Sequence, residues 1–234
     1  MQYVIADIHG CYESFLKLLD KIHFSDEDTL YVLGDSVDRG PDPVRLLMDL
    51  SMRGNVYHIM GNHEYMALTC LKKMMVEITE ENCETQLNAE DISSYLHWLR
   101  DGGETTVEQF RRLTRDEQES LIEYIEDMSM YEIAETEKGV FALIHAGIAG
   151  FVPGKALSEY TEAELLFERS DYGKRYFEHA VLVTGHTPVL VLSDKQPPEV
   201  LFFETSNQIA VDCGACYGGR LACLCLDTLE VVYQ

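Results

Sequence analysis

Basic residues are scarce in this sequence. The chain has 18 Lys and Arg against 41 Asp and Glu, which gives a formal net charge of −23. A chain with this charge is repelled by the phosphates of nucleic acids and by anionic membrane surfaces. We therefore expect neither nucleic acid nor a membrane as a partner. Any anionic ligand requires local positive charge in its site, from arginines or from metal ions.

Long apolar runs are also missing. No stretch is long enough to span a bilayer, and the chain opens on the strand-like Met1–Ile5 with no basic region or cleavage site. The seven cysteines are an odd number, which does not indicate a disulfide framework. These features favour a cytoplasmic protein whose thiols stay free.

The order of apolar patterns predicts an α/β fold. A helix with Phe15, Leu18 and Ile22 on one face and a second helix over 43–52 separate the first strands. This order indicates mixed β-sheets flanked by helices, and the close spacing of the later strands suggests a hairpin-rich second sheet. The short, mostly β-branched runs that predict the strands are 2–8, 29–34, 55–60, 139–144, 180–184, 200–204, 208–211, 220–227 and 229–233.

One region differs from this pattern. Residues 65–135 carry most of the acidic runs and read as helical over 65–78 and 92–128, with a capping box at Thr114 and Glu117. We interpret 65–135 as a helical cap inserted within a single domain that spans 1–234. A length of 234 residues with 46% apolar residues is sufficient for one substantial core.

Potential metal ligands follow five of the predicted strands, at the edge where open α/β sheets usually build sites. Carboxylate, imidazole and amide groups suit manganese, iron or zinc. Any one of these residues could instead serve a turn or a helix cap, and we interpret His23, His58, His97 and His179 as structural. The candidate ligands are Asp7, His9, Asp35, Asn62, His145 and His186.

Together these motifs resemble the phosphoprotein phosphatase branch of the calcineurin-like metallophosphoesterases. The resemblance rests on Asp7-Ile8-His9, on 34–40 (GDSVDRG), on 61–64 (GNHE), and on His145, His186 and the tail 212–219, so it spans nearly the whole chain. It implies a four-layer αββα sandwich. The compact length and the tail resemble bacterial and phage members and the diadenosine tetraphosphate hydrolases.

The resemblance implies a role for each residue. Asp7, His9 and Asp35 would hold one divalent ion, and Asp35, Asn62, His145 and His186 a second, with Asp35 bridging the two. Manganese is favoured, with iron and zinc open. The implied reaction is direct attack by a metal-bridging hydroxide, without a phosphoenzyme.

Other residues would act on the substrate. The resemblance makes His63 the general acid, oriented by Asp38. Arg39 and Arg169 would bind phosphate oxygens, with Asn62 and His63 also in contact with the substrate.

Two positions depart from the family pattern. Ser36 replaces a common aromatic residue, and Cys213 stands where a threonine or a small residue is usual. Cys213 and Cys216 form a Cys-x-x-Cys pair, but no partner pair has zinc-ribbon spacing. We therefore do not expect a zinc site there, and we leave a redox role open.

The leading functional hypothesis is a serine/threonine protein phosphatase, acting on a phosphorylated protein or peptide or on a small phosphoester. The first alternative is a symmetrical bis(5′-nucleosyl)-tetraphosphatase, whose nucleoside pocket would be sought in 65–135. The second is a non-catalytic metal-binding interaction module. The substrate and the oligomeric state stay open, since a fold does not determine them.

Overall fold

The computed structural model describes residues 1–77 and 88–234, and its strands form two five-stranded sheets. The first sheet has the order β10-β9-β1-β2-β3, and the second has the order β4-β5-β6-β8-β7. In the first sheet the strands are β1 (Gln2–Ile5), β2 (Thr29–Leu33), β3 (Val56–Ile59), β9 (Ala222–Cys225) and β10 (Val231–Tyr233). In the second they are β4 (Tyr131–Thr136), β5 (Gly139–Ile144), β6 (Ala180–Thr184), β7 (Leu201–Phe203) and β8 (Gln208–Ala210).

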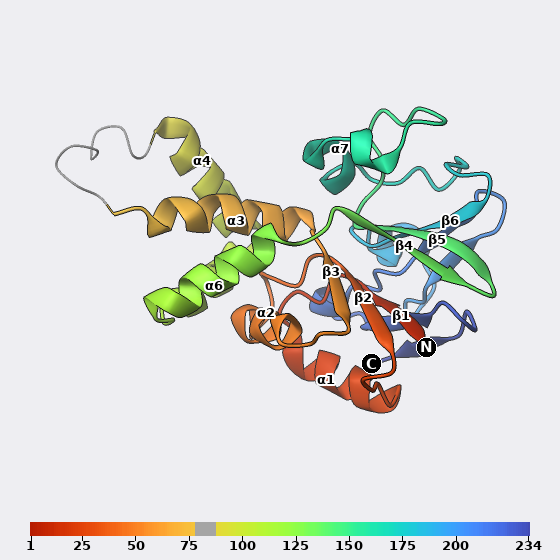
Figure 1. Ribbon diagram of the computed structural model, residues 1–234, viewed down its shortest axis with the longest axis horizontal. Helices are drawn as coiled ribbons and strands as arrows, with labels where there is room; N and C mark the ends of the chain where they lie inside the picture. The colour runs from red at the N-terminus through yellow and green to blue at the C-terminus, as the bar shows by residue number, and fades with distance from the viewer. Residues whose placement is uncertain (78–87) are drawn as a thin grey trace.

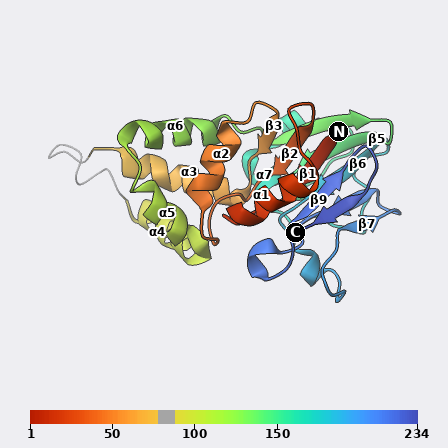
Figure 2. The same ribbon diagram turned by 90° about the horizontal axis from the view of Figure 1, so that it is seen from below.

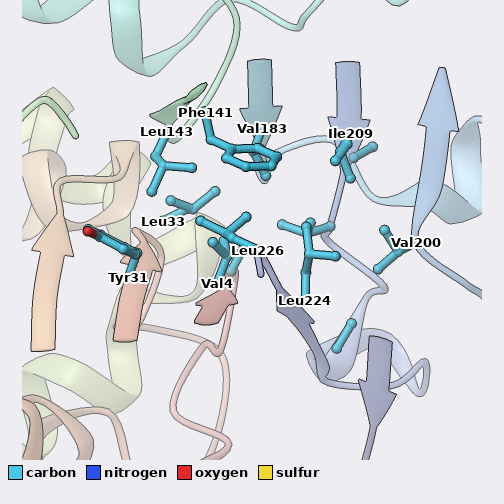
Figure 3. Packing of buried hydrophobic residues seen from close by; sticks show 14 of the residues in the cluster. Val4, Tyr31, Leu33, Phe141, Leu143, Val183, Val200, Ile209, Leu224 and Leu226 are labelled. Carbon is cyan, nitrogen blue, oxygen red and sulfur yellow. The ribbon is translucent and has the colours of Figure 1, made fainter. Parts of the chain in front are cut away.

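The two sheets pack face to face, with apolar side chains of both between them. Val4 and Leu33 of the first sheet meet Phe141, Leu143 and Val183 of the second, as Figure 3 shows. Alternate residues of the same strands are buried on the outer face of each sheet, because successive side chains point to opposite sides. The strands therefore read as continuous apolar runs, which is why they are recognisable in the sequence.

Helices cover the outer faces. Helix α1 (Tyr12–Lys21) packs on the first sheet through Phe15 and Leu18, and α2 (Pro43–Ser51) joins the same cluster through Leu46. Figure 2 shows α1 lying across the outer face of β1. On the second sheet, the short helix α7 (Glu162–Leu166) and its flanking loops take this place. The expected α/β fold, with two mixed sheets flanked by helices, is confirmed.

A helical lobe projects from the end of β3 (Figure 1). It consists of α3 (Asn62–Met75), α4 (Ala89–Trp98), a π-helical turn (Leu99–Gly103), α5 (Glu104–Phe110) and α6 (Arg115–Glu126). The prediction of a helix over 92–128 is therefore wrong in detail, since the chain breaks at Gly102 (φ 113°) and again before α6. Residue 78 of the predicted 65–78 helix lies outside the described residues. Within the described ranges, no helix has the length and the apolar run needed to cross a bilayer.

Two strand predictions need correction. Strand β4 was not predicted and overlaps the end of the 65–135 region interpreted as a helical cap, because Glu132 and Glu135 interrupt its apolar pattern and only Ala134 is fully buried. Charges of this kind are typical of a strand at the edge of a sheet. The later strands were expected to form a hairpin-rich second sheet. Hairpins β4–β5 and β7–β8 do lie in that sheet, but the hairpin of β9 and β10 joins the first sheet beside β1.

Candidate functional site

The predicted ligands meet at one edge of the sandwich. Strands β1, β2 and β3 run parallel, as do β5 and β6 of the other sheet, so the loops after them converge. Two groups of side chains there have ligand atoms within 4.8 Å of one another. The first group is His9, Asp35 and His63, and the second is Asp35, His145 and His186.

Two histidines are oriented by backbone carbonyls. His9 Nδ1 lies 2.8 Å from the carbonyl oxygen of Val37, and His145 Nδ1 lies 2.7 Å from that of Leu33. A carbonyl can only accept, so each Nδ1 donates and leaves the lone pair of Nε2 facing the cluster. Metal-binding histidines are usually held in this way. Burial also lowers the pKa of His9 to about 3, which keeps its imidazole neutral and able to bind a metal.

Asp35 lies between the two groups. Its Oδ2 atom is 3.6 Å from His9 Nε2, and its Oδ1 atom is 3.5 Å from His145 Nε2. Asn62 Oδ1 lies 2.9 Å from both His145 Nε2 and His186 Nδ1. This arrangement fits two divalent cations that share Asp35 as a ligand, and the donor set of carboxylates, imidazoles and an amide is chemically suited to them.

Several buried carboxylates lie close to one another, and their negative charge outweighs the nearby positive charge of Arg39. Burial raises the pKa of Asp7 well above its usual value, and the nearby Asp212 and Asp35 raise it further. Burial likewise raises the pKa of Asp212 to about 7. Isolated buried carboxylates are costly unless they are paired or bind cations. Their accumulation here is a second reason why the site suits metal ions.

The backbone around the ligands is strained. Asp7, His9, Asp35 and His186 all have positive φ, between 43° and 60°, a region that non-glycine residues rarely adopt. Gly34 (φ 74°) packs so closely on Gly61 that an added Cβ would lie 2.5 Å from the backbone of Gly61. Strain of this kind is maintained only where the surrounding structure requires it, and it is common at functional sites.

Glu64 fixes two of the ligand loops. Its fully buried carboxylate accepts hydrogen bonds from the backbone N–H groups of Asp35, Ser36, Val37 and Gly61, at 2.7 to 3.1 Å. The side chain therefore joins the loop after β2 to the start of α3. Sequence analysis noted its position in the GNHE motif but assigned it no function.

His63 and Asp38 form the predicted pair. His63 Nδ1 lies 2.7 Å from Asp38 Oδ2, so its Nε2 faces the cavity. The lobe holds Asp38 in place, since Trp98 Nε1 donates to Oδ2 at 2.8 Å and Thr106 Oγ1 donates to Oδ1 at 2.6 Å. Burial lowers the pKa of His63, but the charges of Asp35 and Asp38 outweigh it, and the net shift is upward.

We expect Trp98→Phe to lower kcat about tenfold with little change in KM, since a hydrogen bond to a charged group contributes roughly 1.5–3 kcal/mol. The variant keeps most of the ring volume and removes only the N–H donor to Asp38. The loss should be larger for phenyl phosphate than for p-nitrophenyl phosphate, whose leaving group is less basic. Tyr95→Phe, which alters the ring packed against Trp98, is the matched control. An equal loss on both substrates would contradict a role in proton donation.

Arg39 supplies positive charge to the cluster. Its Nη1 lies 2.6 Å from His9 Nε2, and its Nη2 lies 2.8 Å from His63 Nε2. Asp101, in the π-helical turn of the lobe, accepts from Nη2 at 3.1 Å. Arg39 donates into the lone pair of His9 Nε2, and a bound metal would need that same lone pair. The Arg39 guanidinium would therefore have to move away from His9 when a metal binds.

These side chains surround a cavity of about 510 Å³. Arg169, the second predicted phosphate-binding arginine, also lines it. An apolar wall of Pro188, Leu190, Val191 and Tyr217 forms the other side. The structure thus brings every predicted site residue to this cavity or into contact with its lining.

Comparison with protein families agrees with this geometry. The model of the calcineurin-like phosphoesterase family matches residues 3–190. The chain belongs to this family. The serine/threonine branch indicated by the resemblance is a finer assignment, which the match does not establish.

Relatives of this phosphoesterase carry a narrower description. A symmetrical bis(5′-nucleosyl)-tetraphosphatase of Wigglesworthia glossinidia brevipalpis is 39% identical, over 42% of this chain and 37% of that relative. The asymmetrical bis(5′-nucleosyl)-tetraphosphatase PrpE of Geobacillus sp. (strain WCH70) is 28% identical, over 98% of this chain and 91% of its own length. A crystal structure described as a candidate diadenosine tetraphosphatase superposes with a TM-score of 0.68 at 18% identity, covering 100% of this chain and 92% of that one.

Several residues of this phosphoesterase site were given no role by the sequence, although Asp212 and Tyr217 lie in the quoted tail. Asp212 follows β8 as Asp7 follows β1, so the rule that found the other ligands could have found it. Asp101, Trp98 and Thr106 lie in the lobe, and no pattern there marks them as neighbours of the ligands. Tyr217, which lies in the quoted tail, has its ring 5.3 Å from the Arg39 guanidinium carbon.

Ser36 and Cys213, the two departures from the family pattern, lie at positions whose contacts the structure defines. Ser36 Oγ lies 3.0 Å from Nε2 of the buried His58, so the smaller side chain leaves room for a polar contact. Cys213 and Cys216 are free thiols, and burial raises the pKa of each to about 12. A reactive cysteine needs a lowered pKa, so the surroundings of this pair do not favour redox chemistry.

Proposed function

We propose that this phosphoesterase hydrolyses dinucleoside tetraphosphates. The observation that carries the proposal is the composition of the cavity, which combines metal-ligand groups and two arginines with an exposed apolar wall. Val191 is 61% exposed and Tyr217 is 57% exposed, so both are accessible to a ligand in the cavity. A ligand with a polyphosphate chain and an aromatic base would occupy both parts.

Different side chains of the cavity would have different roles in hydrolysis. Arg39 and Arg169 would bind phosphate oxygens and stabilise charge that develops in the transition state. Asp7, His9, Asp35, Asn62, His145 and His186 would hold two divalent ions, which lower the pKa of water and polarise phosphoryl oxygens when bound. A water oxygen forms a bond to phosphorus as the P–O anhydride bond breaks. The leaving phosphate oxygen takes a proton from His63 Nε2, the attacking water gives up a proton to solvent, and His63 is then reprotonated from solvent.

The serine/threonine phosphatase hypothesis has less support. The two relatives described above are bis(5′-nucleosyl)-tetraphosphatases, and their substrates are phosphoanhydrides rather than phosphoproteins. A dinucleoside tetraphosphatase also needs an apolar surface for the nucleoside. The apolar wall of Pro188, Leu190, Val191 and Tyr217 would serve this role, and it lies on loops of the second half of the chain rather than in 65–135.

The deciding experiment is a parallel assay in manganese-containing buffer on diadenosine tetraphosphate and on a phosphoserine or phosphothreonine peptide. We expect kcat/KM to be at least about tenfold higher for the dinucleotide, since a site for the base contributes roughly 1–3 kcal/mol. Chromatography of the products distinguishes two ADP, from symmetrical cleavage, from ATP and AMP. Higher kcat/KM for the peptide would overturn the proposal in favour of a protein phosphatase.

A further inference from the structure

A second cavity, of about 400 Å³, lies between α3, α4 and the loop that follows α7. Its lining includes the aromatic side chains of Tyr65, His97 and Phe167. Phe167 is 45% exposed, and its ring meets that of Tyr65 edge to face, with centroids 6.0 Å apart. Exposed Phe167 beside half-buried Tyr65 offers a stacking surface for a planar ring.

Two short segments of the chain contribute residues to both cavities. Phe167 lies two residues from Arg169, which lines the first cavity. His97 of the second cavity precedes Asp101 of the first by four residues, on the continuous helical segment of α4 and the π-helical turn. Residues four apart on a helix are neighbours on its surface. Arg169 and Asp101 of the first cavity therefore lie close along the chain to Phe167 and His97 of the second.

Aromatic side chains thus line both cavities. Tyr217 lines the first together with Arg39 and Arg169, and Phe167 with Tyr65 lines the second. A ligand that matches both linings has a base at each end and phosphates in the middle. A phosphopeptide has one phosphate and no second planar group at a fixed distance from it, so it would leave one of the two surfaces unused.

We propose that the cavity of Tyr65, His97 and Phe167 binds the second nucleobase of a dinucleoside polyphosphate, while the wall of Tyr217 and Val191 binds the first. This inference rests on the proposed function. It assigns His97, which the sequence suggests is structural, to a ligand site. It also gives the acidic lobe a role, since the lobe supplies two of the three aromatic side chains.

The test compares a substrate that has two bases with one that has a single base. Diadenosine tetraphosphate and adenosine 5′-tetraphosphate are assayed with the wild-type protein and with Phe167→Ala. Because stacking on an aromatic side chain contributes roughly 1–3 kcal/mol per base, we expect KM for the dinucleotide to rise about tenfold and KM for the one-base substrate to change by less than about twofold. Phe167→Tyr, which keeps an aromatic ring, should raise KM for the dinucleotide less than Phe167→Ala does.

Phe202→Ala is the matched control, since Phe202 is 44% exposed and lies on β7, outside both cavities. An unchanged KM for the dinucleotide in Phe167→Ala, or an equal rise for both substrates, would overturn the second base site alone. If the wild-type protein failed to turn over the dinucleotide at all, the proposed function would fail together with the site. The two failures are therefore distinguishable.

Discussion

The Asp35→Asn variant is expected to lose about 10³-fold in kcat/KM on diadenosine tetraphosphate, since a contribution of about 4 kcal/mol to charge stabilisation corresponds to that factor. Asp35 is the one side chain common to both ligand groups, with separate oxygens 3.6 Å from His9 Nε2 and 3.5 Å from His145 Nε2. Asparagine keeps the shape of the side chain but removes its charge and one oxygen ligand. Steady-state kinetics in manganese buffer measure the loss.

Metal content provides a second readout that does not depend on turnover. After gel filtration, Asp35→Asn should retain fewer manganese ions per chain than the wild-type protein, as measured by elemental analysis. Asp194→Asn, which removes an exposed carboxylate on a loop, should retain the wild-type number. If Asp35→Asn kept both the full metal content and full activity, the shared-ligand arrangement would be wrong.

We expect His63→Ala to lower kcat by roughly 10²-fold on diadenosine tetraphosphate, at the lower end of the 10²–10⁴ range for general acid catalysis. The leaving phosphate of an anhydride is a weak base and needs less protonation than an alkoxide or a phenolate. The loss should therefore be larger on phenyl phosphate than on p-nitrophenyl phosphate. KM should change little, because His63 acts on the leaving oxygen in the transition state.

The control for this variant is His179→Ala, whose side chain is 95% exposed and remote from the cavity lining. Thermal unfolding of His63→Ala should be measured alongside, since its backbone N–H also donates to Asp35 Oδ1 at 3.0 Å. The substitution keeps that N–H, so the ligand loop should persist. Near-normal turnover of phenyl phosphate by His63→Ala would rule out the general-acid role.

The strand-end ligands could be predicted because each one follows a continuous apolar run. Asp7, Asp35, Asn62, His145 and His186 all come directly after buried strands, and parallel strands bring such positions to one edge. The same apolar runs predicted the α/β fold, whereas the four-layer sandwich was implied by the family resemblance. The ligand roles of these residues stay predictions until metal binding is measured.

The remaining features depend on contacts that no local pattern shows. Trp98 and Thr106 contact Asp38 across 60 and 68 residues of sequence, and either would be interpreted as an ordinary helix residue. Strand β4 was missed because an edge strand needs little apolar surface. The nucleoside wall was expected in 65–135, but Val191 and Tyr217 reach the cavity from short turns after β6 and β8, whose direction is set by packing.

The position of β9 affects how the chain folds as it is synthesised. Strand β1, which leads to Asp7 and His9, is hydrogen-bonded on one edge to β2 and on the other to β9. A nascent chain therefore leaves one edge of β1 unpaired until residues 222–225 have left the ribosome, and Figure 1 shows the last strands beside the first. Contacts of such long range form slowly and leave strand edges open to aggregation. The loop that carries Asp7 and His9 therefore has its supporting strand paired on both edges only after β9 has formed, so chains truncated before β9 should be less stable and prone to association.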